Sequence, residues 1–394
     1  MDYTPVGLIN TEGTCYMNAT LQCLYNIREL TNYLLELKVG KNTILSEYIN
    51  VLSGLKNNTT PYDASNFRKK MEKINKLFKS YKGHDPSDLI IFLFNGLQNE
   101  LSPYPKIKLW FYEKIIYNEE LREIYDDIEK TKINDLFNCI TIQTLKCRCK
   151  NPTYIYQTQQ MIVLNINTDD SLNNFLENFK KPYLSHSTCN ICKGQYLISK
   201  DIKIYPKYMI FVLNSINKHI KYQVRYNEYL YLNEDNINIA YSLFGGIIHK
   251  GSNSNSGHFV SYCRNIQNNN YYYFNDSSVQ LTDFERVKNE SPYILFYQRS
   301  QGQYQYENQD NENFLNYAYK KNKDIIFFNF SYESMKITGI INSKTKEVVI
   351  NPLDVEDISR IHKLENIIMK IIANLNQISD ESMKKIYLVI KKSI

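Results

Sequence analysis

The sequence predicts a mixed α+β fold, in which a helical first part is followed by a long run of strands. In roughly the first hundred residues, apolar side chains recur mainly at helical spacing. From residue 139 onward, short segments rich in β-branched and aromatic residues predominate. Helices and strands that are segregated along the chain are typical of α+β proteins. At 394 residues, the chain is long enough for one large or two ordinary domains with a substantial core.

The first expected helix begins at a cysteine. Residues 10–14 are polar and contain glycine, which indicates a loop, whereas apolar residues after Cys15 follow a helical period and predict a helix over residues 15–37. At a helix start, unpaired backbone N–H groups and the positive end of the helix dipole favour an anion. A thiolate is such an anion and is the nucleophilic form of cysteine. The alternative for Cys15 is a buried structural thiol, the commoner fate of a free cysteine.

Further helices are expected up to about residue 94. Residues 42–82 have a mostly helical pattern, interrupted by a turn near residues 57–62. Asp85 is expected to cap a helix that begins at Pro86, because aspartate is a favoured capping residue and proline a favoured first residue.

Strands follow, with one short helix expected over residues 168–184. The expected strands cover residues 139–147, 154–166, 196–204, 208–216, 257–264 and 271–276, with further short strands over 217–299. Residues 250–257 are small and polar and predict a loop.

Two cysteine pairs indicate a metal site. They are Cys147-Arg-Cys149 and Cys189-Asn-Ile-Cys192, and four thiolates from two hairpins suit a closed tetrahedral zinc site. The first pair has only one intervening residue, but residues i and i+2 of an extended segment face the same way, so both sulfurs can reach one ion. The alternative is a degenerate site that has lost its metal; structural zinc is favoured. The grouping indicates a reducing compartment and no disulfide framework.

Composition argues against two classes of partner. The net charge of +6 is spread along the chain without a dense basic stretch, so no nucleic-acid partner is expected. No apolar run approaches the roughly 20 residues of a membrane helix, and no membrane association is expected. The first residues lack the charged and apolar regions of a secretory signal, which favours a cytoplasmic or nuclear location.

Three groups of motifs resemble the ubiquitin-specific protease family, in the family's order, from residue 7 to about 299. Its cysteine box is matched by Gly7-Leu-Ile-Asn10, Thr14-Cys-Tyr-Met-Asn18 and Leu21-Gln22. Its histidine box is matched by Tyr241-Ser-Leu243, His249-Lys-Gly251, Gly257-His258, Tyr262 and Phe274-Asn-Asp276. The strand that closes its catalytic domain is matched by Tyr293-Ile-Leu-Phe-Tyr297.

The resemblance implies a fold and an activity. The fold is that of papain-like cysteine proteases, with a catalytic domain over residues 1–299 divided into thumb (about 1–120), fingers (about 137–216, including the zinc) and palm. The activity is thiol-dependent hydrolysis of the isopeptide or peptide bond after the C-terminal glycine of ubiquitin. The implied partners are ubiquitin and ubiquitinated proteins, with no catalytic cofactor; the oligomeric state is not predicted.

The resemblance also implies catalytic roles. Cys15 is the nucleophile, His258 the base that later acts as an acid, and Asn10 a donor to the oxyanion. Asn275 and Asp276 are neighbours on an apparently extended segment, so their side chains are expected on opposite faces and only one should reach the imidazole. The match favours Asn275 as the orienting residue and gives Asp276 a supporting role near the oxyanion. The alternative for His258 is a histidine that only forms hydrogen bonds within a sheet. The alternative for Asn10, Asn275 and Asp276 is that they only shape loops or turns.

Three positions match substrate contacts of the family. Asp85 and Asp88 fall on the two acidic positions of a segment that usually reads Gln-Gln-Asp-Ala-x-Glu-Phe, which implies that they face the arginine-bearing tail of ubiquitin. The alternative is that both only stabilise a helix N-terminus; contact is favoured for Asp85, and the two interpretations are balanced for Asp88. Phe259 occupies a substrate-binding position where the family commonly has tyrosine.

Three other functions remain open at this point. One is the same chemistry on another ubiquitin-like modifier, and another is a general papain-like peptidase, for which zinc-bearing fingers would be superfluous. The third is a catalytically weak ubiquitin-binding module, because Glu12 replaces a family glycine and could either strain the loop or raise the pKa of the Cys15 thiol by like-charge repulsion. Activity is favoured, since the nucleophile and the base are both present.

Beyond residue 299 the resemblance ends. Residues 300–323 are expected to be a polar linker, and residues 324–394 a small C-terminal α/β extension of unassigned role. Two or three strands are predicted over 324–350, with a turn at 342–345. An apolar helical seam over residues 361–378 precedes a second helix that carries Met383, Ile386 and Ile390. A self-packed helix pair is favoured over a partner-binding helix.

Overall fold

The computed structural model describes most of the first 300 residues and five strands beyond them. The described residues are 5–11, 13–79, 84–115, 119–216, 222–234, 237–253, 256–265, 268, 270–300, 316–322, 325–332, 335–342, 348–350 and 388–390. The chain divides into two compact units, residues 1–235 with 241–300 and residues 236–240 with 301–394.

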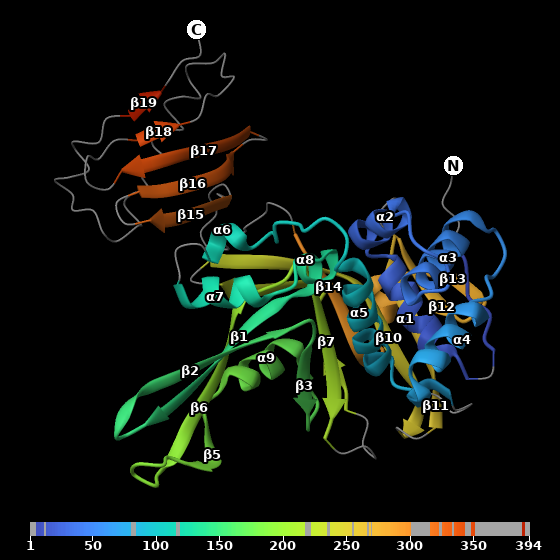
Figure 1. Ribbon diagram of the computed structural model, residues 1–394, viewed down its shortest axis with the longest axis horizontal. Helices are drawn as coiled ribbons and strands as arrows, with labels where there is room; N and C mark the ends of the chain where they lie inside the picture. Colours follow the sequence, from blue (N-terminus) through green and yellow to red (C-terminus); the bar gives the residue numbers. More distant parts are fainter. Residues whose placement is uncertain are drawn as a thin grey trace. The chain divides into compact units, whose positions relative to one another are not determined.

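Most helices of the first unit come early in the chain. They are α1 (Cys15–Tyr25), α2 (Arg28–Glu36), α3 (Ile44–Asn57), α4 (Ser65–Ile74), a 3-10 turn (Lys76–Lys79), α5 (Pro86–Leu101), α6 (Tyr112–Ile115), α7 (Glu119–Asp127) and α8 (Lys132–Phe137). Helices α1 to α5 gather at one end of this unit (Figure 1). Asp85 caps α5 by accepting a 2.8 Å hydrogen bond from the Ser87 amide, which confirms the predicted start at Pro86.

The prediction of one helix over residues 15–37 is wrong. The chain leaves the helical conformation at Ile27, which separates α1 from α2. The Asn26 side chain donates to the Gln22 carbonyl, and the Thr31 hydroxyl donates to the Tyr25 carbonyl, both at 2.9 Å or less. Polar side chains therefore satisfy carbonyls at the end of α1 that a continuing helix would have used.

An eight-stranded sheet lies beside these helices. Its order is β13-β12-β11-β10-β14-β7-β3, with β9 also paired to β10. The strands are β3 (Ile162–Ile166), β7 (Tyr208–Ser215), β9 (Tyr229–Glu234), β10 (Ile237–Asn253), β11 (Ser256–Arg264), β12 (Tyr271–Asn275), β13 (Ser278–Thr282) and β14 (Pro292–Arg299). The short helix α10 (Phe284–Val287) precedes β14. The prediction of a loop over residues 250–257 is wrong, because β10 and β11 extend into it and Asn253 pairs with Ser256.

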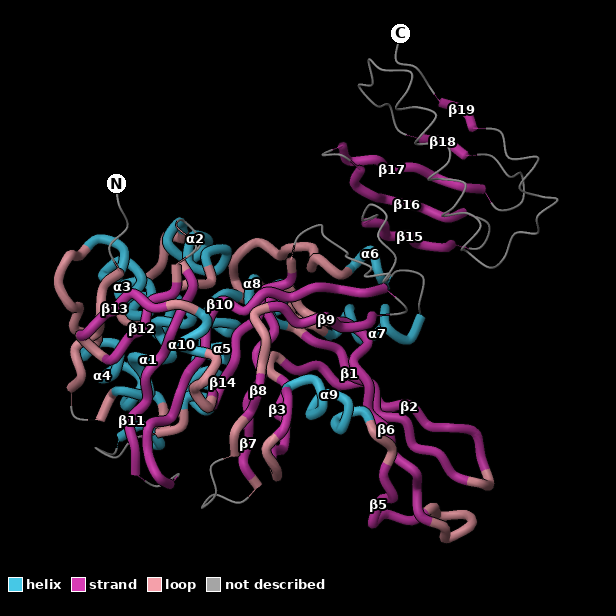
Figure 2. Tube along the Cα trace, turned by 180° about the vertical axis from the view of Figure 1, so that it is seen from behind, coloured by secondary structure: helices cyan, strands magenta, loops and turns pink. Residues whose placement is uncertain are grey.

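A second sheet of four strands projects from the same unit (Figure 2). Its order is β2-β1-β6-β5, and its strands are β1 (Cys139–Cys147), β2 (Lys150–Gln159), β5 (Tyr183–Thr188) and β6 (Gln195–Ile204). The single strand predicted over residues 154–166 is wrong, since its two halves, β2 and β3, belong to different sheets. The predicted short helix is confirmed as α9 (Leu172–Lys180), beside the small strands β4 (Asp170–Ser171) and β8 (Val224–Arg225).

The hydrophobic core joins the helices to the eight-stranded sheet. Every residue of α1 is buried, and its apolar side chains after Cys15 belong to one cluster with residues of α3, α5, β7, β10 and β14. Helix α1 also packs along β11. A fully buried helix is held on all sides, so the position of its first residue is fixed by the packing of the whole unit.

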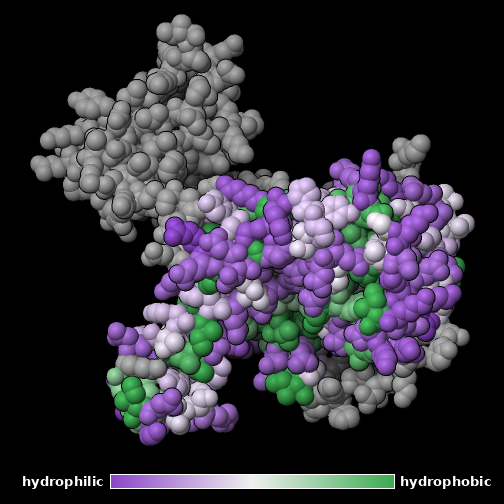
Figure 3. Space-filling view, viewed as in Figure 1, coloured by the Kyte–Doolittle hydropathy of each residue, from purple (hydrophilic) through white to green (hydrophobic). Residues whose placement is uncertain are grey.

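The projecting sheet exposes apolar side chains. Tyr154, Leu184, Ile191 and Leu197 are large hydrophobic residues with 39–71% of their surface exposed. Figure 3 shows apolar areas on this sheet and on the neighbouring surface in the same view. Among the described residues, no helix is long and apolar enough to cross a membrane.

The second unit contains a five-stranded sheet in the order β15-β16-β17-β18-β19. Its strands are β15 (Asn316–Asn322), β16 (Ile325–Tyr332), β17 (Met335–Asn342), β18 (Val348–Ile350) and β19 (Leu388–Ile390). The strands predicted over 324–350 are therefore confirmed, whereas β15 occupies part of the expected linker. Ile390 lies in β19, which pairs in parallel with β18, so its predicted placement in a helix is wrong. The seam over 361–378 lies outside the described residues.

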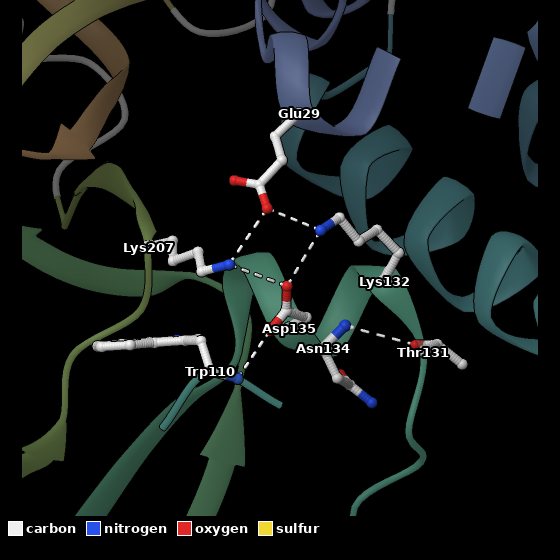
Figure 4. Close-up of polar contacts among 7 residues, drawn as sticks. All are labelled: Glu29, Trp110, Thr131, Lys132, Asn134, Asp135 and Lys207. Carbon is white, nitrogen blue, oxygen red and sulfur yellow. Dashed lines mark hydrogen bonds and ion pairs between the residues drawn. The ribbon is translucent and has the colours of Figure 1, made fainter. Parts of the chain in front are cut away.

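Alternating charges connect α2, α8 and the residue before β7 (Figure 4). Glu29 Oε1 lies 2.7 Å from Lys132 Nζ and 3.1 Å from Lys207 Nζ. Asp135 Oδ2 lies 3.2 and 3.1 Å from the same two ammonium groups. The Asp135 side chain is only 6% exposed, and its other oxygen accepts a hydrogen bond from the Trp110 amide at 2.8 Å. This carboxylate is thus compensated by two cations and a backbone donor.

Removal of this carboxylate should destabilise the first unit. Asp135→Ala leaves Lys132 and Lys207 without their buried anion, and breaking such a buried pair costs about 3 kcal/mol. The matched control is Glu129→Ala, which removes an exposed ion pair with Lys106 and should cost less than about 1 kcal/mol. Urea unfolding of both variants measures the difference. Equal losses would show that the network contributes no more than a surface pair.

Candidate active site

The first turn of α1 is prepared by the loop before it. The Asn10 side-chain oxygen accepts hydrogen bonds from the Thr14 amide at 3.1 Å and the Thr14 hydroxyl at 3.2 Å. The Thr14 hydroxyl oxygen in turn accepts from the Thr11 amide at 3.0 Å. Cys15 follows as the first residue of α1 and is 6% exposed. Polar loop side chains therefore fix the backbone that enters the helix.

The environment of the Cys15 sulfur has opposing effects on its acidity. Burial is the largest effect and raises the pKa of the thiol above its ordinary value. Backbone hydrogen bonds from Phe259, Tyr16 and Cys15 itself act in the opposite direction, and the negative charge of Asp276 raises the pKa again. The net rise keeps an isolated Cys15 thiol protonated at neutral pH, so its reaction as a nucleophile requires a base.

His258 directly precedes Phe259, whose backbone forms a hydrogen bond with the Cys15 sulfur. The imidazole Nε2 lies 2.6 Å from Asn275 Oδ1 and 3.5 Å from Asp276 Oδ2. An amide oxygen only accepts hydrogen bonds, so the 2.6 Å contact requires a proton on Nε2. In the neutral ring this leaves Nδ1 unprotonated and able to take a proton.

The expectation that Asn275 and Asp276 face opposite ways is wrong. Asn275 is the last residue of β12, but Asp276 has a φ of 51° and belongs to the turn before β13. Aspartate tolerates this left-handed conformation better than most residues. The turn swings the Asp276 side chain to the same imidazole that Asn275 contacts, so the structure brings both candidates to His258.

Asp276 is also held by two amides from the opposite end of the domain. Asn10 Nδ2 donates to Oδ2 at 2.8 Å, and Asn18 Nδ2 donates to Oδ1 at 2.7 Å. Asn18 matches the cysteine box, but the motif alone assigns it no role. Its spacing of three residues from Cys15 was a usable signal, because residues three apart share a helix face.

Gly7 allows the segment before α1 to approach the turn after β12. The Leu8 amide donates to the Asp276 carbonyl at 2.9 Å. A Cβ atom on Gly7 would lie 2.5 Å from the Ser277 carbonyl oxygen and 2.7 Å from that of Asp276. No side chain fits at those distances, so close backbone contact between the cysteine and histidine segments depends on glycine.

The three expected substrate residues lie in different surroundings. One Asp85 oxygen accepts from the Ser87 amide and hydroxyl, and the other accepts from the Tyr293 hydroxyl. Asp88 is exposed, and partial desolvation, then the charge of Asp85, raises the pKa of its carboxyl. The Phe259 ring packs between His249 and Tyr293, with centroid distances of 4.7 and 5.8 Å.

The four paired cysteines converge at the turns of the projecting sheet. Cys147 ends β1 and Cys149 lies in the β1–β2 turn, whereas Cys189 and Cys192 lie between β5 and β6. The sulfur of Cys147 lies 3.4 Å from that of Cys149 and 3.1 Å from that of Cys192, while Cys149 and Cys189 are 3.5 Å apart. All four sulfurs lie within 4.8 Å of one another. Four thiolates around one zinc ion sit roughly 3.8 Å apart, given bonds of about 2.3 Å, so this cluster could hold a metal ion.

Comparison with known proteins identifies relatives across the first 300 residues. The family model described as "Ubiquitin carboxyl-terminal hydrolase" matches residues 6–297. The chain is 24% identical over 323 residues to probable ubiquitin carboxyl-terminal hydrolase 16 of Schizosaccharomyces pombe, covering 74% of this chain and 66% of that protein. It is 26% identical to ubiquitin carboxyl-terminal hydrolase 4 of Arabidopsis thaliana, covering 72% and 86%. It is also 26% identical to ubiquitin carboxyl-terminal hydrolase 2 of Homo sapiens, and the match covers 74% of this chain and 54% of that protein. The match thus spans from about half to most of each relative.

Solved structures share the fold. The SAGA DUB module of Ubp8, Sgf11, Sus1 and Sgf73 bound to monoubiquitin matches with a TM-score of 0.60 at 20% identity, covering 75% of this chain and 69% of that chain. The same module bound to ubiquitin aldehyde matches with a TM-score of 0.59 at 19% identity, covering 75% and 70%. At this identity the likeness establishes a mixed α+β fold of the same kind.

The raised pKa of the Cys15 thiol allows a test of whether His258 acts as its base. In His258→Ala the thiol should retain a pKa above its ordinary value of 9.0, so less than about 1% is thiolate at pH 7. Alkylation of Cys15 by iodoacetamide should then be at least about tenfold slower than in the unaltered protein at pH 7, and should recover only above pH 9. Mass spectrometry of the Cys15 peptide across pH 6–10 measures the rate.

The matched control is His249→Ala, on the neighbouring strand β10. Its ring contacts Phe259, and its removal should leave the alkylation profile of Cys15 close to that of the unaltered protein. Identical profiles for the two histidine variants would exclude His258 as the base.

Proposed function

We propose that this chain, which belongs to the ubiquitin carboxyl-terminal hydrolase family, is a thiol-dependent deubiquitinase that hydrolyses the bond after the C-terminal glycine of ubiquitin. The observation that carries the proposal is that the backbone of Phe259, the residue after His258, hydrogen-bonds the Cys15 sulfur, while the His258 ring contacts Asn275 and Asp276. A thiol, an imidazole and an orienting polar group are the set that amide hydrolysis by cysteine requires.

The reaction follows from these positions. His258 accepts the thiol proton on Nδ1, and the Cys15 sulfur attacks the carbonyl carbon of the terminal glycine. The tetrahedral intermediate collapses as the imidazolium returns the proton to the leaving lysine amine, which leaves a thioester on Cys15. Water, deprotonated by His258, then attacks the thioester and releases free ubiquitin and the thiol. Asn275 keeps Nε2 protonated, so the reacting nitrogen is always Nδ1.

Asn10 has the hydrogen-bonding capacity for an oxyanion donor. Its amide group carries two N–H bonds, and one of them is engaged with Asp276 Oδ2. The other is available, and Asn10 is exposed. The Cys15 backbone N–H, which already points at the sulfur, provides a second donor at the helix start. Asp276 thereby supports the oxyanion donor and the imidazole together.

Asp85, Asp88 and Phe259 are assigned to binding of the ubiquitin tail. Asp88 offers an exposed carboxylate to an arginine of the tail. Asp85 is engaged with Ser87 and Tyr293, yet a carboxylate has about four acceptor sites, so it can accept from the substrate as well. Phe259 and Tyr293 provide apolar contact beside the extended chain.

The globular body of ubiquitin is assigned to the projecting sheet. We equate this sheet with fingers (about 137–216), the early helices with a thumb (about 1–120), and the eight-stranded sheet with a palm. The exposed side chains Tyr154, Leu184 and Leu197 give the sheet an apolar contact surface. Zinc bound by the four cysteines would join the two turns that end this sheet. Ubiquitinated proteins are the expected substrates.

The zinc assignment is tested by metal content and stability. Protein purified without chelator should carry about one zinc ion per chain, and its removal should lower the melting temperature because the metal joins two separate turns. Cys192→Ser should lose zinc, whereas His186→Ala, an exposed position on β5 of the same sheet, should retain it. An identical melting curve with and without zinc would contradict a structural role.

The nucleophile is tested with a fluorophore attached to the ubiquitin C-terminus. Cys15→Ala should abolish fluorophore release and retain ubiquitin binding, because the substituted side chain is small and buried. Cys23→Ala, on the same helix, should keep kcat within about threefold, as expected away from the reacting atoms. Turnover by Cys15→Ala at the unaltered rate would refute the mechanism. Probes tipped with an electrophile, one on ubiquitin and one on a related modifier, identify which modifier is recognised.

A further inference from the structure

Asn18 makes a buried polar contact with Asp276, whose other oxygen faces the His258 ring. It lies one turn after Cys15 on α1, and it is 2% exposed. Its Nδ2 donates to Asp276 Oδ1 at 2.7 Å, and lies 3.4 and 3.3 Å from the carbonyl oxygens of Leu8 and Ile9. One buried amide thus joins the first helix, the loop that precedes it and the turn after β12.

The orientation of this amide is fixed by its surroundings. Three acceptor oxygens surround Nδ2, whereas Oδ1 is buried with no hydrogen-bond partner among the described residues. Rotation of the amide by half a turn would place Oδ1 against the three oxygens and leave the two N–H bonds without acceptors. Burying a polar atom without a hydrogen-bond partner costs free energy. The Asn18 side chain carries this cost at Oδ1 in the orientation that directs Nδ2 at Asp276.

Because of this contact, the two oxygens of the Asp276 carboxylate have different partners. Oδ1 is occupied by Asn18, so Oδ2 faces Asn10 at 2.8 Å and the His258 ring at 3.5 Å. Asp276 also has a left-handed backbone, a conformation that persists where the surroundings enforce it. Asn18 supplies part of that enforcement from a fully buried helix.

We propose that Asn18 is a positioning residue, which holds Asp276 so that one oxygen of its carboxylate orients the Asn10 amide and the His258 imidazole together. The proposal rests on the proposed function only for the roles of Asn10 and His258. Asn18 touches no reacting atom; its effect reaches the reaction through Asp276.

A matched control lies one turn further along α1. Gln22 is also 2% exposed, and its Nε2 donates to the Val6 carbonyl at 2.8 Å. Gln22→Leu therefore removes a buried amide from the same helix without touching Asp276. Comparison with Asn18→Leu separates the loss of a buried hydrogen bond from the loss of this particular contact.

The first test is a double-mutant cycle on the fluorogenic ubiquitin substrate. Asn18→Leu should lower kcat about 10- to 100-fold with KM little changed, since small displacements of catalytic groups cost up to about 100-fold; Gln22→Leu should change kcat less than threefold. In an Asp276→Ala background, Asn18→Leu should cost less than a further threefold, because its effect passes through the missing carboxylate. The same 10- to 100-fold loss in both backgrounds would overturn the proposal.

The second test requires no ubiquitin. Asn18→Leu should slow alkylation of Cys15 by iodoacetamide at pH 7 about tenfold, and Gln22→Leu less than twofold. Equal rates for the two variants would overturn the positioning role. If the unaltered protein fails to cleave ubiquitin but Asn18→Leu still slows alkylation selectively, the proposed function is wrong and the positioning role stands.

A further variant tests the proposal if Asn18→Leu does not fold. Asn18→Asp keeps the size of the side chain and replaces the donor by a second carboxylate against Asp276. It should lower the rate of alkylation at least as much as Asn18→Leu. Alkylation at the unaltered rate in Asn18→Asp would refute the need for a donor at this position.

Discussion

The site depends on one carboxylate that is shared between the two ends of the first unit. Asp276 receives amides from Asn10 and Asn18 at the start of the chain, and its Oδ2 lies 3.5 Å from the His258 ring. The backbone contact between Leu8 and Asp276 holds the same two segments together. This junction adds to the hydrogen bond by which the backbone of Phe259, next to His258 on β11, reaches the Cys15 sulfur on α1.

Burial and reactivity conflict at Cys15, and the fold reconciles them. The helix that presents the thiol is enclosed by the core, and this enclosure raises the pKa of the thiol. A buried thiol is ordinarily inert. Here the backbone of Phe259 reaches the sulfur and brings the strand that carries His258 with it, so the packing that suppresses ionisation also brings the proposed base to the site.

The sequence predicted elements whose cause is local and failed where long-range contacts decide. The start of α5 follows from Asp85 and its neighbours alone, and it was predicted correctly. The break at Ile27 depends on side chains that return to the helix end, which a hydrophobic period does not reveal. The left-handed turn at Asp276 depends on amides from the far end of the chain, so the convergence of Asn275 and Asp276 on one imidazole could not be derived from strand alternation. Motif matching collected residues that the structure brings into contact around Asp276, among them Asn10, Asn18 and His258, but a motif does not by itself assign their roles.

The complete burial of α1 has a consequence for synthesis of the protein. The helix is made before the strands that enclose it, and His258 emerges from the ribosome more than 200 residues after Cys15. A nascent chain that ends before β14 therefore carries the thiol without the enclosure that gives it a defined environment. The environment that the folded protein gives this thiol is therefore complete only after β14, the last strand of the eight-stranded sheet along the chain, has been synthesised.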